Sequence, residues 1–447
     1  MKSMGKLKVS IHTLGCKVNQ YESELISEQF ASHGDEIAGE NEFADVYIIN
    51  TCTVTGIADR KSRQIIRRKK KINKDALIVV TGCYAQVASE EVEKIDDVDI
   101  VIGNNLKSTI YETVHRLIDI KSHEKIVSVL PLEDLNCYED MGISLGIASG
   151  RTRAYIKIQE GCNRFCSYCM IPFARGRIRS RSLDDIILEV HSLLKNGAKE
   201  IVLTGINTAL YGFDFEKNGR YPLSELIEKI DEIEGDFRIR LSSLEPTVVN
   251  KDDVMSLIGY DKLARHLHLS AQSGSTNILK KMNRTYDRNG YLKIVKAIRD
   301  YDPLYGISTD IIVGFPYESE KDFEDSLMLL SEAEFCRVHA FKYSPRKGTK
   351  AASFKNRVDS DIKNRRIDKL ISEASKVSLN FINKNKMTVE RVLTEERTGD
   401  YVTGYTGNYI KAYILDRDRN IKTGEFYNVR IIEPYEDGCL AQVEMIE

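Results

Sequence analysis

The stretch GCNRFCSYCMIP, residues 161–172, places three cysteines at positions 162, 166 and 169, directly after the apolar run AYIKIQE. That run predicts a buried strand, so the cysteines lie in a loop at its carboxyl end. A structural zinc site needs a fourth ligand, and no nearby His or Cys supplies one. A thioredoxin-like role would use Cys166 and Cys169 but leave Cys162 without a function. A cubane iron–sulfur cluster held by three thiolates leaves one iron open to an external ligand, and the loop favours this interpretation.

Five further apolar runs follow this loop. Each ends in polar residues or glycine: EIVLTGIN, FRIRLSSLEP, HLHLSAQSG, ISTDIIVGF and CRVHAFKYSP. Together with the first run they predict an incomplete (β/α)6 barrel over residues 151–382. In such barrels the site lies at the carboxyl ends of the strands, which is where the three-cysteine loop lies.

The rest of the chain predicts two other folds and a connector. Over residues 6–120 the apolar runs KVSIHTLG, ADVYIIN, ALIVVTG and VDIVIGN alternate with helical patterns, which predicts a doubly wound parallel α/β sheet. Residues 121–150 are irregular and are expected to form a connector. Residues 383–447 contain short strands with Gly and Asp turns, which predicts a small β-barrel.

Three more cysteines each follow one strand of the first block. Cys16 follows HTLG, Cys52 follows YIINT and Cys83 follows LIVVTG. Because the carboxyl ends of parallel strands meet along one edge of a sheet, we expect these thiols to converge although 36 and 31 residues separate them. A single buried cysteine is often only a small hydrophobe. Three in successive units favour a second three-thiolate cluster.

Composition excludes several function classes. The 65 basic and 67 acidic residues nearly balance, so no global charge indicates a nucleic-acid partner. There is no long apolar run and no basic-then-apolar leader, so we expect a cytoplasmic protein without a membrane partner. In that compartment nine cysteines indicate metal binding or catalysis before disulfides. The sequence gives no indication of the oligomeric state.

The three-cysteine loop after the first barrel strand resembles that of the radical S-adenosylmethionine enzymes, which also carry an aromatic residue before the third cysteine, here Tyr168. The resemblance implies a 4Fe–4S cluster whose open iron is chelated by S-adenosylmethionine. It also implies the contacts with that cofactor: Tyr168 against the adenine, Thr204 and Gly205 near the amino group, and Ser242 and Gln272 within reach of ribose or carboxylate oxygens. No catalytic side chain is assigned beyond the cluster ligands.

Both cysteine sets together resemble the methylthiotransferase family, with matching phrases that include TLGCKVNQYESE, NTCTVT, TGCYAQ and YSPRKGT. The resemblance covers nearly the whole chain. It implies replacement of a C–H bond by C–S–CH3, with two 4Fe–4S clusters, two molecules of S-adenosylmethionine and an electron donor such as flavodoxin or ferredoxin. A non-catalytic iron–sulfur RNA-binding regulator remains an alternative, although all six ligand cysteines are present.

The phrases GCKVNQYES and ARGRIRSR look most like the branch that modifies carbon 2 of N6-threonylcarbamoyladenosine beside the anticodon in tRNA. The threonyl group carries a carboxylate, which suits the planar guanidinium groups that lie near the loop. These are Arg175, Arg177, Arg179 and Arg181. They could instead pair with other carboxylates. Isopentenyladenosine tRNA and an aspartate of a ribosomal protein are the alternative substrates. In tRNA, the adenosine is expected to be extruded from its stack.

Two regions are expected to contact RNA. The run RKSRQIIRRKKKINK, residues 60–74, contains nine basic residues and no acidic one. A basic helix is often only a solvated face, but beside a cluster that meets RNA we interpret it as a phosphate-binding surface. The residues chosen there are Arg67, Arg68, Lys69 and Lys70. The terminal barrel resembles the TRAM domain, an RNA-binding module, in which Lys411 would contact phosphate and Tyr401, Tyr405 and Tyr409 would stack on bases unless they are core residues.

Overall fold

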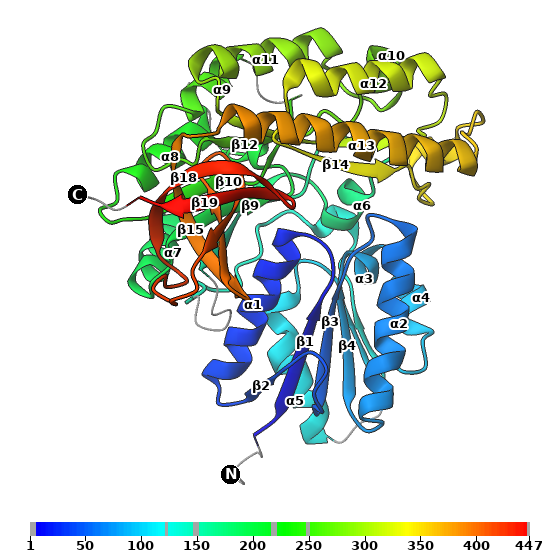
Figure 1. Cartoon of the computed structure of the whole chain (residues 1–447). Coiled ribbons are helices and arrows are strands. Elements are labelled where there is room, and N and C mark those ends of the chain that lie inside the picture. Colours follow the sequence, from blue (N-terminus) through cyan, green and yellow to red (C-terminus); the bar gives the residue numbers. More distant parts are fainter. Residues whose placement is uncertain (1–5, 121–123, 146–151, 216–220, 247–250, 445–447) are drawn as a thin grey trace.

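A computed structural model describes residues 6–120, 124–145, 152–215, 221–246 and 251–444, and these form three parts (Figure 1). The first part, blue to cyan, is a six-stranded parallel sheet with the order β2-β1-β3-β4-β5-β6. Its strands are β1 (Lys8–Thr13), β2 (Glu36–Ala38), β3 (Val46–Thr51), β4 (Leu77–Gly82), β5 (Ile100–Ile102) and β6 (Ile126–Ser128).

Helices cover both faces of this sheet, so it is doubly wound as predicted. They are α1 (Lys17–Ser32), α2 (Gly56–Ile72), α3 (Cys83–Val87), α4 (Ser89–Glu93) and α5 (Ile110–Ile120). Successive strand residues point to opposite faces, so Ile48 of β3 packs with α1 and α5 whereas Ile49 packs with α2 and α4. Both faces are therefore apolar, and the polar groups collect at the strand ends.

Two short strands were not expected. β2 and β6 each contain three residues, and β6 lies within residues 121–150, where we expected only a connector. β6 pairs in parallel with β5 and extends the sheet. A three-residue strand is too short to show the alternating pattern that sequence reasoning needs.

The second part is the incomplete barrel, and its six parallel units are the six predicted ones. Its strands are β7 (Arg153–Glu160), β8 (Arg179–Ser180), β9 (Glu200–Gly205), β10 (Arg238–Leu241), β11 (Ser243–Leu244), β12 (His266–Leu269), β13 (Gly306–Val313) and β14 (Arg337–Lys342). They form two sheets, β10-β9-β7-β8 and β11-β12-β13-β14. A parallel bridge between Ile239 and Leu263 joins the two sheets. The short β8 runs antiparallel to β7.

Most helices of the barrel cover its outer face (Figure 1). The helices of this part are α6 (Ile171–Arg175), α7 (Leu183–Lys195), α8 (Pro222–Asp231), α9 (Lys251–Leu257), α10 (Thr276–Lys281), α11 (Arg288–Tyr301), α12 (Glu320–Ala333) and α13 (Ser360–Lys384). The short α6 is the exception, since it lies at the interface with the first part. None of the helices in the described ranges is both long and apolar enough to cross a bilayer.

The third part is a closed five-stranded barrel that follows α13, as the sequence predicted. Its strands are β15 (Val389–Thr398), β16 (Tyr401–Thr406), β17 (Lys411–Leu415), β18 (Phe426–Tyr435) and β19 (Gly438–Val443), in the order β15-β16-β17-β19-β18. β19 was not among the predicted strands. It closes the barrel by pairing with both β17 and β18.

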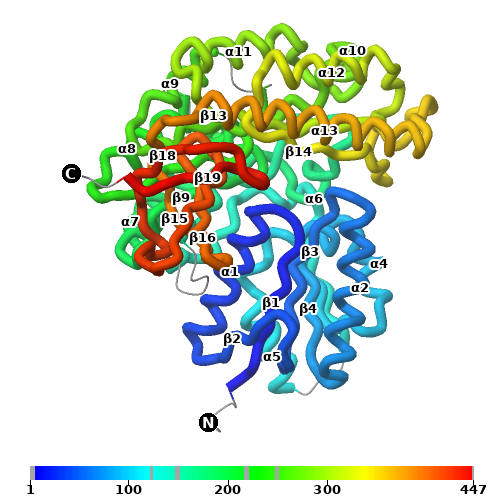
Figure 2. The backbone as a smooth tube through the Cα atoms, in the orientation of Figure 1, coloured from blue at the N-terminus to red at the C-terminus, as the bar shows by residue number. Residues whose placement is uncertain are grey.

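The closed barrel, orange to red, lies beside the second part (Figure 2). It contacts the amino-terminal ends of the strands of that part. Glu200, at the start of β9, is fully buried and accepts from Arg238 Nε at 2.6 Å and from Arg240 Nε at 2.9 Å. The same two arginines donate to the carbonyl oxygens of Tyr405 and Thr406, at 3.1 and 3.2 Å. Because this interface occupies the amino-terminal ends, the carboxyl ends stay available for the site and face the first part.

Candidate functional site: two cysteine triads at a domain interface

The structure brings Cys16, Cys52 and Cys83 together, as the sequence predicted; we call them the auxiliary triad. They follow β1, β3 and β4, which are neighbours in the sheet. Their thiols lie near enough to influence one another's ionisation. Gly15 has a φ of 103°, and a Cβ there would lie 2.7 Å from Cys52 Cβ, so this position needs glycine to let two of the loops approach.

Burial lowers the acidity of two of these thiols. It raises the pKa of Cys16, and it raises the pKa of Cys52 to about 12. Both thiols therefore stay protonated at neutral pH when no metal is bound. A cysteine binds a metal as the thiolate, so binding of iron to this triad would release protons.

Cys162, Cys166 and Cys169 form the second set, the radical triad, in a loop after β7. The loop is fixed by its backbone: Cys162 N–H donates to Gly176 O at 3.0 Å, and Cys169 N–H donates to Cys166 O at 3.0 Å. Burial raises the pKa of Cys162, and it raises the pKa of Cys169 to about 12. Cys162 and Cys169 therefore stay protonated at neutral pH when no metal is bound, and the thiols of this triad lie close to one another.

Tyr168, inside the radical loop, is held by two residues that sequence reasoning missed as site residues. Its hydroxyl accepts from Arg284 Nη2 at 2.6 Å, and Arg284 is ion-paired with Glu245. Burial raises the pKa of Tyr168, so the phenol stays neutral. Nothing in the sequence spacing links position 284 to the loop. The link arises because the segment after α10 folds back over it, and Ser167 N–H donates to Met282 O at 3.0 Å.

The residues expected to contact S-adenosylmethionine lie at the carboxyl ends of the barrel strands. Thr204 Oγ1 and Ser242 Oγ are 3.3 Å apart, so β9 and β10 bring these two hydroxyls together. At Gly205 a Cβ would lie 3.0 Å from Gln159 O, which leaves little room for a side chain. Gln272 follows β12 with a φ of 63°. Their contacts with the cofactor remain predictions.

Each triad offers three thiols, which is the donor set that a cubane iron–sulfur cluster uses when its fourth iron takes an external ligand. Among the described residues, no three His, Cys, Asp or Glu side chains are placed to hold one metal ion. Zinc would need every ligand within about 2.3 Å of one point. The thiolates of a cubane bind different irons, so they surround the site without converging on a single atom.

A buried network of charges fills the interface between the two triads. Glu22 of α1 and Glu160 of β7 are fully buried and both accept from Arg175 Nη1 at 2.5 Å. Lys157 bridges the same two carboxylates at 3.1 and 3.2 Å, and Lys107 pairs with Glu22 at 3.1 Å. Burial would raise the pKa of Glu160, but Lys157 and Arg175 outweigh it and lower the pKa to about 2. The network stays ionised at neutral pH and fixes the first part against the barrel.

This network corrects the prediction that four arginines are free to bind a substrate carboxylate. Arg175 and Arg179 are buried, and Arg179 donates to Leu135 O and Arg175 O at 2.8 Å. Arg181 is buried and ion-paired with Glu189. Three of the four guanidinium groups are thus used within the protein. Arg177 alone of the four is exposed, and its role remains a prediction.

The basic helix α2 needs a similar correction. Arg67 and Arg68 are exposed, as an RNA-binding surface requires. Lys69, however, is buried and donates to Glu40 O, and Lys70 donates to Ala76 O at 2.8 Å. These two lysines fasten the helix to the sheet and are not available to phosphates.

In the closed barrel, two of the three expected base-stacking residues belong to the domain interface. Tyr405 lies under Arg153 with the guanidinium 4.7 Å from the ring centroid, and Tyr409 stacks on His266 with centroids 4.3 Å apart. Tyr401 instead packs against Tyr413 and Tyr435, and all three rings are half-buried. The sequence analysis did not name Tyr413 or Tyr435.

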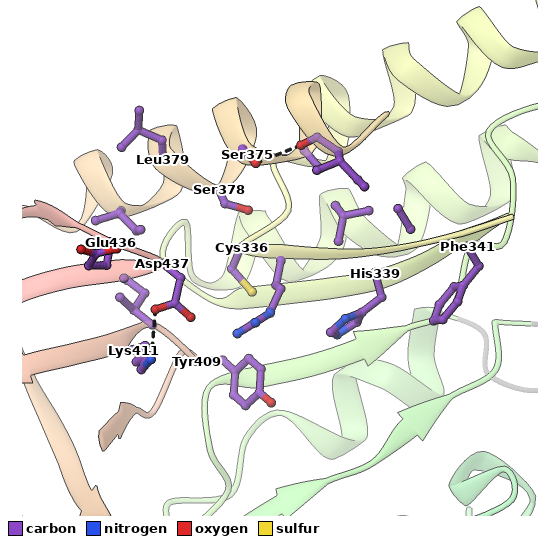
Figure 3. A pocket seen from close by; sticks show the side chains of 18 residues that line it. Cys336, His339, Phe341, Ser375, Ser378, Leu379, Tyr409, Lys411, Glu436 and Asp437 are labelled. Carbon is purple, nitrogen blue, oxygen red and sulfur yellow. Dashed lines mark hydrogen bonds and ion pairs between the residues drawn. The ribbon is translucent and has the colours of Figure 1, made fainter. Parts of the chain in front are cut away.

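Lys411 lines a groove of about 650 Å³ between β14, α13 and the closed barrel (Figure 3). Figure 3 shows Lys411 beside Asp437, with which it forms an ion pair at 3.1 Å, on the side where Tyr409 enters the groove. The cation is therefore partly neutralised. A phosphate contact there would have to compete with Asp437.

The fold and the three-cysteine loop define the class: this is a radical S-adenosylmethionine enzyme. Residues 156–330 match the Radical SAM superfamily, and residues 8–103 match the family described as "Uncharacterized protein family UPF0004". A radical S-adenosylmethionine methyltransferase from Kitasatospora setae, TsrM, has a similar fold, with a TM-score of 0.55 at 12% identity over 76% of this chain and 77% of that one. Membership of this superfamily implies a 4Fe–4S cluster and S-adenosylmethionine.

Within this class, the chain belongs to the methylthiotransferase family. It is 37% identical to the threonylcarbamoyladenosine tRNA methylthiotransferase MtaB of Bacillus subtilis, over 97% of this chain and 96% of that one. It is 36% identical to the MtaB of Thermotoga maritima over 98% of both chains. It is also 37% identical to a tRNA-2-methylthio-N(6)-dimethylallyladenosine synthase of Clostridium botulinum, over 95% of this chain and 94% of that one.

Proposed function

We propose that this enzyme attaches a methylthio group to carbon 2 of N6-threonylcarbamoyladenosine beside the anticodon in tRNA. It would use two 4Fe–4S clusters, two molecules of S-adenosylmethionine and an external electron donor. The observation that carries the proposal is the placement of two cysteine triads on either side of one domain interface, each at the carboxyl ends of parallel strands. One site can serve the radical step and the other can present sulfur to the same substrate carbon.

The chain's own residues would hold the two groups in different ways. Cys162, Cys166 and Cys169 leave one iron of a cubane without a protein ligand, and Thr204 and Ser242 offer hydroxyls on the same side of the barrel. Cys16, Cys52 and Cys83 likewise leave one position open. When bound, the clusters and S-adenosylmethionine supply the radical and the methylated sulfur; the protein supplies binding, orientation and exclusion of water.

The choice of the threonylcarbamoyl substrate rests on the matching phrases, on MtaB relatives and on Arg177. Identity alone does not favour it, since a dimethylallyladenosine synthase is equally similar. Arg177 is exposed, and its carbonyl oxygen lies 1.7 Å from the position that a Cβ on Gly161 would occupy, so its backbone touches the residue before Cys162. A guanidinium in this place suits a carboxylate close to the reacting base.

Two exposed surfaces support an RNA substrate. α2 begins just after the loop of Cys52, and its later half presents the exposed Arg67 and Arg68. The closed barrel presents Tyr401, Tyr413 and Tyr435 on its outer side. Phosphates would meet the first surface and bases the second.

Nucleoside mass spectrometry of tRNA tests the proposal. Cells that lack this chain are compared with cells that express it, and with cells that express a variant with Cys162, Cys166 and Cys169 replaced by Ala. We expect 2-methylthio-N6-threonylcarbamoyladenosine only with the intact chain. Appearance of the 2-methylthio form of isopentenyladenosine would assign the other branch. No change in any tRNA nucleoside, with a change in a ribosomal protein aspartate, would reject the tRNA substrate.

A further inference from the structure

Arg175 reaches from the loop of one triad to a thiol of the other. It ends α6, six residues after Cys169, and its side chain is fully buried. Its Nε–H donates to Cys83 Sγ at 3.4 Å, across 92 residues of sequence and across the domain interface. Contact with a thiol is not required for an arginine to join the two domains. Arg181 pairs with Glu189 in its own domain and donates to the Tyr21 hydroxyl of the first, without touching a cysteine.

The other nitrogens of Arg175 are all engaged, which fixes the direction of the Nε–H bond. Nη1 donates to Glu22 and Glu160, each at 2.5 Å. Nη2 donates to Asn19 Oδ1 at 2.6 Å and to Glu22 at 3.0 Å. With its fork held on two sides, the guanidinium cannot turn away from the sulfur. Lysine lacks this planar set of donors and could not satisfy the same partners.

The partners of Arg175 also hold the other two loops of the auxiliary triad. Asn19 Nδ2 donates to Leu14 O at 2.7 Å and to Thr51 O at 2.9 Å, just before Cys16 and Cys52. On the Cys83 side, Asn104 Nδ2 donates at 2.7 Å to Ala174 O, the residue before Arg175. All three thiol loops are therefore connected to α6 through hydrogen bonds.

We propose that Arg175 is a positioning residue for the auxiliary site: it holds the Cys83 thiolate by a charge-assisted hydrogen bond and sets the reduction potential of the cluster bound there. The inference rests on the proposed function, because it requires a cluster at the auxiliary triad. Hydrogen bonds to ligand sulfurs and nearby positive charge stabilise the reduced, more negative form of a cluster. Lys107 and Lys157 lie with Arg175 around Glu22, so the network brings three cations close to the auxiliary triad.

The test is a potentiometric titration of the auxiliary cluster, followed by electron paramagnetic resonance. The background is the full chain with Cys162, Cys166 and Cys169 replaced by Ala, so that only the auxiliary cluster contributes. Arg175→Gln should lower its midpoint potential, with at least a tenfold fall in the reduced-to-oxidised ratio at fixed potential, which is about 59 mV for one electron. Arg175→Lys, which keeps a charge, should give a smaller shift in the same direction.

Arg181→Gln is the matched control, because it removes a buried guanidinium from the same interface without a thiol contact. It should leave the midpoint potential unchanged. If Arg175→Gln and Arg175→Lys also leave it unchanged while the cluster is bound, the inference is wrong. Equal shifts in all three variants would assign the effect to the interface as a whole and would also overturn it. If the background protein binds no cluster, the two-cluster proposal fails and the inference fails with it.

A second measurement does not depend on how the Arg175 variants fold. The background protein is labelled with ¹⁵N-arginine, reduced, and studied by electron–nuclear double resonance. We expect a weak ¹⁵N coupling from a nitrogen next to a ligand sulfur. Absence of this coupling in a protein that carries the reduced cluster would overturn the contact.

Discussion

The two triads hold the same number of cysteines but are built in opposite ways. The radical triad comes from one loop of eight residues, 162–169, and the segment that supports it, which follows α10, belongs to the same domain. The auxiliary triad comes from three strands and is completed by Arg175 of another domain. A local loop can be recognised and transferred as a motif. A dispersed triad exists only when a whole sheet and its interface have formed.

Removing each triad in turn tests most directly whether the two triads have different roles. Replacing Cys162, Cys166 and Cys169 by Ala should abolish formation of deoxyadenosine from S-adenosylmethionine. Replacing Cys16, Cys52 and Cys83 should retain this cleavage but abolish methylthiolation. Each variant should bind about four irons after anaerobic reconstitution, and the intact chain about eight. Cys137→Ala, an exposed cysteine outside both triads, is the control. Unchanged iron in the second variant would mean that the auxiliary triad binds no cluster.

The next largest effect concerns the stability of the interface. Glu22→Gln removes the carboxylate between Lys107, Lys157 and Arg175. Lys107 then loses its ion pair with Glu22, and the other two cations keep only their pairs with Glu160. Breaking a buried ion pair in this way typically costs about 3–5 kcal/mol of unfolding free energy. Chemical denaturation followed by circular dichroism measures it.

The control for Glu22→Gln is Glu36→Gln, because Glu36 forms only an exposed pair with Lys8 at 3.4 Å. Its denaturation midpoint should stay close to that of the unchanged chain. Equal midpoints for both variants would mean that the buried network does not stabilise the interface. The claim that the auxiliary triad depends on this interface would then be wrong.

Near the radical triad, replacement of Arg177 is expected to have a smaller and more selective effect, on tRNA binding. If it binds the threonyl carboxylate, Arg177→Gln should weaken binding of threonylcarbamoyl-tRNA by about 1.5–3 kcal/mol, the worth of a hydrogen bond to a charged group. Binding of the same tRNA without the threonylcarbamoyl group should change little. Filter binding of both tRNAs across a salt series measures this. An equal loss for both tRNAs, with a flatter salt dependence, would make Arg177 a phosphate ligand.

The smallest effect is expected on α2, beside the auxiliary triad. Arg67→Gln and Arg68→Gln should each reduce the slope of tRNA affinity against salt by about 1, as loss of one phosphate contact does. Lys70→Gln is the matched control on the same helix, because Lys70 is tied to Ala76 O and Asp99. Equal slopes for all three variants would place the RNA away from this helix.

The sequence predicted those features that follow from chain topology. Successive parallel strands bring their carboxyl ends together, so Cys16, Cys52 and Cys83 could be expected to converge without knowledge of any side chain. The burial of Arg175 and Lys69 could not be predicted in this way. A charged residue is buried only when partners such as Glu22 or Glu40 O reach it, and these lie on elements far away in the sequence. The same limit applies to Tyr405 and Tyr409, which became interface residues.

Because the buried network joins residues of the first domain to Arg175, its contacts form in a set order as the chain is synthesised. All three auxiliary thiols have been made once residue 83 leaves the ribosome, and Glu22 can pair with Lys107 soon after. Glu22 and Asn19 meet Arg175 only when that residue has followed. Until then the auxiliary site of the first domain lacks the guanidinium group that Glu22 and Asn19 bind. Iron delivered to the nascent chain would therefore meet the three thiols of the auxiliary triad before the contact between Arg175 and Cys83 exists. That contact can form only after the loop of the other triad, residues 162–169, has been synthesised.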